Sequence, residues 1–145
     1  MVSIILQTLW QLPQAIPGLL LVLFGRATHH DSDGAFFYVA RPGGLLAWWL
    51  KTEDPSGTGA GSWAITCGTF ILCASDAAVT NQGLRAHELN HKWWGNVLGP
   101  LFWLAYGVAM NIAWLQGKLP LRENFFERKA DEAGARAEVE AGARA

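Results

Sequence analysis

Residues 87–91, HELNH, carry the most distinctive spacing of reactive side chains in this chain of 145 residues. On a helix, His87 and His91 leave one face a turn apart, which suits two nitrogen ligands of a tetrahedral Zn²⁺. Glu88 lies next to the first ligand and could take a proton from a metal-bound water as that water attacks a carbonyl carbon. Chance gives this pattern in only about 0.005 of chains of such composition, so the sequence predicts a zinc site.

Two histidines and a water leave zinc one protein ligand short. Residues 127–131, ERKAD, place two carboxylates one helical turn apart. Glu127 could supply the third ligand, and Asp131 could accept the free N–H of a ligand histidine and fix its tautomer. Glu123, four residues before Glu127, is the rival third ligand. The intervening chain is long enough for a turn, one full helix and a return to the histidines.

HELNH followed by ERKAD resembles the gluzincin zinc metallopeptidases, in which a glutamate in an ExxxD segment of a later helix completes the HExxH site. The membrane-embedded members, which include the CaaX prenyl proteases and the heat-shock membrane protease, are the most similar in style. The resemblance covers residues 84–134 and implies zinc-dependent hydrolysis of a peptide or protein substrate. It implies these roles: zinc ligands His87, His91 and Glu127, general base Glu88, and Asp131 as the support of a ligand histidine.

Zinc peptidases commonly stabilise the reaction's oxyanion with a Tyr, His or Arg donor. Four residues could supply that donor, and each also suits an ordinary structural role: Tyr106, His29, His30 and Arg122. An extended substrate could add as a strand to a sheet edge, for which residues 63–73 are the candidate.

Two other interpretations of the motif stay open at the level of sequence. The chain could be a catalytically inactive structural or binding protein of the membrane that retains the metal site. It could also be a small membrane scaffold in which HELNH is fortuitous. Metal content and hydrolysis separate the three, since only a peptidase requires both.

Composition narrows the function classes. Of the residues, 51% are hydrophobic and 16% are charged, which excludes a disordered polymer. A formal net charge of −1 argues against a nucleic-acid partner.

The length suits one domain, 1–145, with a core of its own. Cys67 and Cys73 lie too far apart along an expected strand for a disulfide, so we expect them to be small core residues.

The charges are unevenly distributed. Twelve of the 23 charged residues fall in the last 28 positions, and residues 1–25 and 93–117 carry none. As a helix, either window is long enough for a hydrocarbon core of about 30 Å. The first window contains Pro13 and Pro17, where we expect a helix break. The windows favour membrane association, integral or close, with no preferred orientation; a buried, bent helix pair is the alternative for the first.

The predicted fold class is α+β. We expect a small zincin-like domain in which a short antiparallel sheet packs with the HExxH helix, a long apolar helix and a C-terminal helix. An apolar N-terminal helix precedes them within residues 1–25. Short strands are expected within 35–73, the metal-site helices within 80–134, and a solvated, charged tail at 135–145.

Within the strand region, residues 35–40 and 45–50 suggest a hairpin, since both are short and apolar. Residues 29–34 and 52–61 are rich in turn formers and predict connectors. Residues 63–73 alternate enough for a strand, with an interruption at Gly68 left open.

Overall fold

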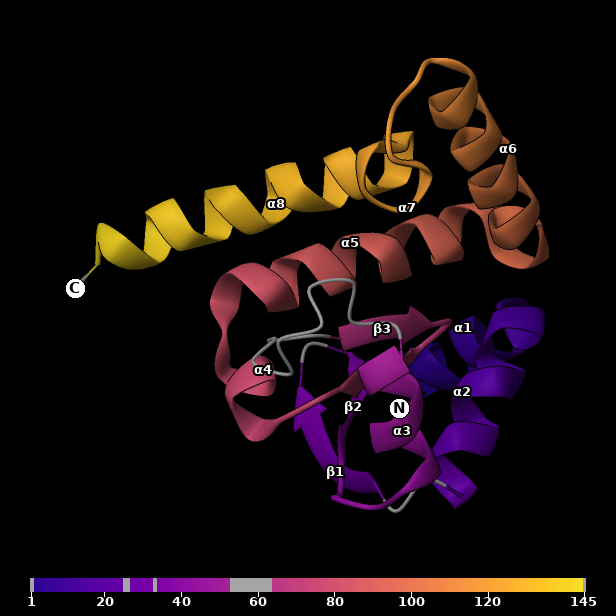
Figure 1. The fold of residues 1–145 in the computed structure, drawn as a ribbon. Helices are drawn as coiled ribbons and strands as arrows, with labels where there is room; N and C mark the ends of the chain where they lie inside the picture. Colours follow the sequence, from indigo (N-terminus) through magenta and orange to yellow (C-terminus); the bar gives the residue numbers. More distant parts are fainter. Residues whose placement is uncertain (1, 25–26, 33, 53–63, 145) are drawn as a thin grey trace.

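The computed structural model describes residues 2–24, 27–32, 34–52 and 64–144, and these combine helices with one small sheet (Figure 1). The α+β class is therefore confirmed. The elements in chain order are α1 (Val2–Trp10), α2 (Leu12–Phe24), β1 (Ala27–Ser32), β2 (Ala35–Ala40), α3 (Leu45–Thr52), β3 (Ala64–Cys67), β4 (Phe70–Cys73), α4 (Asp76–Thr80), α5 (Gln82–Leu98), the 3₁₀ turn η1 (Gly99–Leu101), α6 (Phe102–Leu115), α7 (Pro120–Glu123) and α8 (Phe125–Gly142).

The sheet is mixed and has the strand order β1-β2-β4-β3. β1 pairs with β2 and β3 with β4 in antiparallel fashion, whereas β2 and β4 are parallel. The prediction of a wholly antiparallel sheet was therefore wrong. The hairpin of 35–40 with 45–50 was also wrong, because residues 45–52 form helix α3. β2 instead pairs with the polar strand β1, which covers most of the connector predicted at 29–34.

The stretch 64–73 is a tight hairpin rather than one strand. Gly68 and Thr69 turn the chain between β3 and β4, and Gly68 has φ of +66°, a backbone conformation that glycine adopts at no steric cost. Cys67 and Cys73 lie on different strands, and both are free and buried, as expected for core residues. Of the connector predicted at 52–61, Thr52 is instead the last residue of α3, and residues 53–61 and Trp63 lie outside the described residues.

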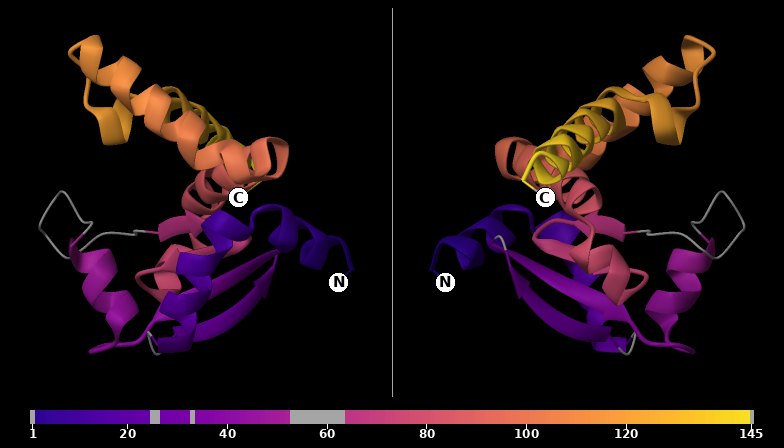
Figure 2. Two further views of the ribbon diagram at one scale, coloured as in Figure 1. Left: turned by 90° about the vertical axis from the view of Figure 1, so that its right-hand side faces the viewer. Right: turned by 90° about the vertical axis from the view of Figure 1, so that its left-hand side faces the viewer.

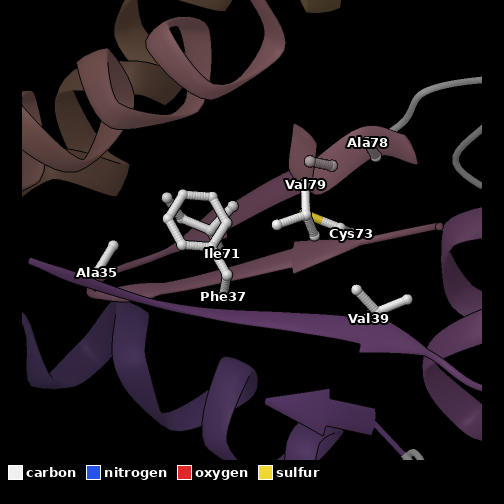
Figure 3. Close-up of a cluster of buried hydrophobic side chains, with 8 residues drawn as sticks. Ala35, Phe37, Val39, Ile71, Cys73, Ala78 and Val79 are labelled. Carbon is white, nitrogen blue, oxygen red and sulfur yellow. The ribbon is translucent and has the colours of Figure 1, made fainter. Parts of the chain in front are cut away.

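Each face of the sheet carries its own cluster of buried side chains. Figure 3 shows the cluster between the sheet and α4, whose labelled members are Ala35, Phe37, Val39, Ile71, Cys73, Ala78 and Val79. Leu84 and Leu89 of α5 pack against it. The opposite face packs against α2 and α3 through a cluster centred on Leu46, Phe70 and Leu72. Successive side chains of a strand point to opposite faces of the sheet, so each strand residue faces either α4 and α5 or α2 and α3.

Helix α5 lies between the sheet and α8, which runs beside it (Figure 1). The two helices approach closely where Gly134 meets Gly83. A Cβ atom added at Gly134 would lie 2.9 Å from the Gly83 carbonyl oxygen and 3.7 Å from the Cβ of His87. Glycine is therefore required at position 134 for this spacing, and the contact lies one turn from the HELNH motif.

The N-terminal apolar segment forms two helices bent by 108°. The break falls at Gln11 rather than at Pro13–Pro17, because Pro13 lies in the first turn of α2, where a missing N–H is tolerated, and Pro17 lies inside α2. Buried side chains attach the bend to the end of α5. Gln11 Nε2 donates to Asn96 Oδ1 at 2.5 Å, and Gln14 Nε2 donates to the Gly99 carbonyl oxygen at 2.6 Å.

Candidate metal centre

Helix α5 presents the two histidines of the motif to α8. It begins after Asn81, whose side chain accepts a hydrogen bond from the Leu84 N–H at 2.7 Å and so caps the helix. Since His87 and His91 are four residues apart, they lie on one face, and their Nε2 atoms are 3.1 Å apart. The predicted helical placement of HELNH is confirmed.

Helix α8 brings Glu127 to the histidines from its first turn. The buried Asn124 is its N-cap, and its side-chain oxygen accepts hydrogen bonds from the N–H groups of Phe126 and Glu127 at 2.9 and 3.2 Å. The start of the helix is thus fixed three residues before the carboxylate. Ala130 and Gly134 follow on the buried side of α8, where small residues let it lie close to α5.

His87, His91 and Glu127 converge on one point. The distance from His87 Nε2 to Glu127 Oε2 is 3.4 Å, and from His91 Nε2 to Glu127 Oε1 it is 3.3 Å. With zinc–nitrogen bonds of about 2.0–2.1 Å, tetrahedral ligand atoms lie about 3.3–3.4 Å from one another. Two imidazoles and a carboxylate in this arrangement therefore fit three corners of a zinc site.

Asp131 supports one of the two histidines. Its Oδ1 lies 3.1 Å from His87 Nδ1, so it accepts that N–H and leaves the Nε2 lone pair free for a metal. His91 has no equivalent support among the described residues, where its buried Nδ1 finds no hydrogen-bond partner. The two histidines are thus held unequally.

The acidity of Glu127 also suits a ligand. Burial raises the pKa of its carboxyl, but the neighbouring His87 and His91 side chains and the Tyr106 hydroxyl outweigh burial and hold that pKa well below its usual range. Glu127 is therefore a carboxylate at neutral pH. The rival, Glu123, is exposed, and its Oε2 accepts the Leu119 N–H at 2.7 Å at the start of α7. The structure brings Glu127 and not Glu123 to the histidines.

One of the four predicted oxyanion donors, Tyr106, contacts the cluster. Its hydroxyl donates to Glu127 Oε1 at 2.5 Å, so it orients the candidate ligand. Arg122 is exposed on α7, and His29 and His30 lie on β1, opposite Tyr38 and Phe37.

Glu88, the predicted general base, is buried and lies against edge strand β3. Thr66 Oγ1 donates to Glu88 Oε2 at 2.8 Å. The sequence singled out no role for Thr66, and no local signal identifies it, since the contact depends on how α5 crosses the sheet.

A depression of about 540 Å³ lies elsewhere, between α4, α5 and α8. Its lining includes Thr80, Gln82 and Arg85 but none of the cluster residues. It is therefore separate from the candidate metal centre.

Comparison with known proteins adds no relative: no protein-family description, no curated protein and no solved structure matches this chain.

Proposed function

We propose that this chain is a zinc-dependent peptidase of gluzincin type, in which Glu88 is the general base. The convergence of His87, His91 and Glu127 at tetrahedral ligand spacing is the observation that supports it best. Zinc in proteins binds imidazole and carboxylate ligands, and a site with three protein ligands leaves the fourth position for water or substrate. The donor set on α5 and α8 therefore fits a catalytic site better than a closed structural one.

The side chains then divide the work. A zinc ion held by His87, His91 and Glu127 would supply Lewis acidity to a carbonyl oxygen and would lower the pKa of a nearby water. Glu88 accepts the proton of the attacking water and delivers it to the departing amine. Asp131 holds His87 in the tautomer that binds through Nε2, and Tyr106 orients Glu127. Burial of Glu88 keeps bulk water from competing for its carboxylate.

Chelation tests this function directly. Purified protein is expected to contain one zinc per chain and to cleave a quenched fluorescent peptide library. A chelator should abolish cleavage, and zinc added in slight excess should restore it. A large fall in melting temperature on chelation, with no cleavage before it, would favour the inactive structural protein. Absence of metal from freshly purified protein would contradict both.

We also propose that this peptidase is associated with a membrane. Gln82–Leu115 is long and apolar enough to cross a bilayer. Only 22% of its apolar window is buried inside the protein, whereas the core helix of a soluble protein is mostly buried. Helix α6 is apolar along nearly its whole length and carries many exposed side chains, although Phe102 and Ala113 are buried, and a helix that is apolar all round belongs in an apolar medium. Its exposed large apolar side chains are Trp103, Leu104, Val108, Ile112, Trp114 and Leu115.

The N-terminal helices add to the same apolar side of the molecule. Figure 1 places α1, α2 and α6 on its right-hand side and the charged end of α8 on the left, and Figure 2 (left) looks onto that right-hand side. Helices α1 and α2 expose Ile5, Leu6, Leu9, Trp10, Leu12, Ile16, Leu19, Leu20, Leu23 and Phe24. An exposed apolar surface to which α1, α2 and α6 all contribute, on one side of a small domain, is typical of a membrane-contacting face.

Flotation with phosphatidylcholine vesicles tests the membrane proposal. Wild-type protein is expected to float, and Val108→Glu on α6 should lower the partition coefficient by about 10- to 100-fold, since a charged side chain is costly in hydrocarbon. Val139→Glu is the matched control, because Val139 is also exposed but lies on the charged helix α8. Wild-type protein that stays monodisperse without detergent and does not float would contradict this localisation.

A further inference from the structure

The carboxylate of Glu88 has one hydrogen-bond partner within the part of the chain that the structure describes. Thr66 Oγ1 donates to Glu88 Oε2 at 2.8 Å, and the same hydroxyl lies 3.0 Å from the Glu88 carbonyl oxygen. Glu88 is only 4% exposed, and no salt bridge joins it to a cation among those residues. This buried anion therefore depends on a hydroxyl from another element.

The sheet fixes the direction of that hydroxyl. Thr66 is paired with Ile71 across the β3–β4 hairpin, and directly paired residues of antiparallel strands share a face. Ile71 is fully buried in the cluster beneath α4 and α5, so Thr66 faces α5 as well. Because threonine is branched at Cβ, its χ1 angle is restricted, and the hydroxyl position follows from the strand.

We infer that Thr66 is a positioning residue for Glu88. Its hydrogen bond holds Oε2, which leaves Oε1 as the oxygen that receives the proton. A hydrogen bond to a charged acceptor is among the stronger ones in proteins, and a buried carboxylate without a donor is left with an uncompensated loss of hydration. Thr66 would therefore act on the rate of hydrolysis without touching substrate or metal. This inference rests on the proposed peptidase function.

Thr66→Val removes the hydroxyl and keeps the shape of the side chain. We expect kcat to fall about 10- to 100-fold, with KM unchanged within about twofold, because the hydrogen bond acts on the base and not on substrate binding. The zinc content should be unchanged. Thr66→Ser, which keeps the hydroxyl, should restore most of kcat. Should Thr66→Val fail to fold, Thr66→Ala removes the hydroxyl without leaving a branched side chain to pack.

Thr69→Val is the matched control. Thr69 lies in the same hairpin and is fully buried, and its hydroxyl pairs with that of Thr8 at 2.7 Å instead of with Glu88. The same isosteric change there should leave kcat unchanged within about twofold if only the Glu88 contact affects the rate. If both valine variants lost kcat equally, the loss would come from the stability of the hairpin and not from the contact with Glu88. That result would overturn the positioning role of Thr66.

A second measurement does not depend on turnover. Unfolding free energies of wild type, Thr66→Val, Glu88→Gln and the double variant give the coupling between the two side chains. The cost of Thr66→Val should be smaller when position 88 is a neutral amide, because a hydrogen bond to a charged acceptor is the stronger one, and equal costs would overturn the stabilisation of the Glu88 carboxylate by this hydroxyl. The cycle could show coupling between Thr66 and Glu88 while wild-type protein binds zinc and cleaves no peptide. That result would overturn the peptidase function and, with it, the catalytic role of Thr66. Hydrolysis by wild type with no effect of Thr66→Val would overturn the Thr66 role alone.

Discussion

Glu88→Gln protein is expected to keep its zinc and to hydrolyse peptides about 10²- to 10⁴-fold more slowly than wild type, which is the usual contribution of a general base. The amide has nearly the shape of the carboxylate and can still accept the Thr66 hydroxyl, but it cannot take a proton from water. Metal content by elemental analysis and cleavage of a fluorescent peptide measure the two quantities separately.

The control for Glu88→Gln is Glu132→Gln. Glu132 is exposed on α8 and pairs with Lys129 at 2.8 Å, so loss of its charge should leave both zinc and hydrolysis unchanged. If Glu88→Gln kept full hydrolysis, Glu88 would not be the base, and the mechanism would be wrong even with zinc in place. If it lost zinc, the residue would serve the metal site instead.

Glu127→Ala is expected to weaken zinc binding by at least about 100-fold, because loss of even a supporting residue around zinc typically costs about 10- to 100-fold in affinity. Removal of the carboxylate leaves two histidines, of which one has no support at Nδ1 among the described residues. Competition against a chromogenic chelator gives the affinity of the variant relative to wild type.

Glu123→Ala is the matched control, since it removes a glutamate four residues earlier whose carboxylate accepts the Leu119 N–H. It should cost some local stability at α7 and leave the zinc affinity unchanged. The reverse outcome, with full affinity in Glu127→Ala and a loss in Glu123→Ala, would exchange the two glutamates and require α7 to turn toward α5.

The candidate centre could be predicted from the sequence because its parts are local and periodic. The spacing of His87 and His91 follows from the helical repeat alone, and so does the pairing of Glu127 with Asp131 on α8. The chain between the two helices is long enough to return. What the residues could not decide is the choice between Glu127 and Glu123, which depends on where α8 begins, and Asn124 as its N-cap fixes that point.

The sheet was harder to predict from the sequence because its strand pairings are not local. Residues 45–50, LLAWWL, form a short apolar run that periodicity cannot assign to helix or strand, and they form α3. Strand β1 is polar, so composition suggested a connector. The parallel pairing of β2 with β4 joins segments more than 30 residues apart. Thr66 was missed for the same reason, since its contact with Glu88 requires the position of α5 over β3.

The backbone contact between Gly134 and Gly83 has a consequence for the energetics of metal binding. Many small zinc domains fold only when the ion arrives, so that part of its binding free energy is consumed in ordering the chain. Here the two ligand helices meet backbone to backbone, and rigid main-chain atoms set their separation in place of adaptable side chains. The three candidate ligands are thus preorganised, and more of the intrinsic affinity of the donor set would be available to hold an ion.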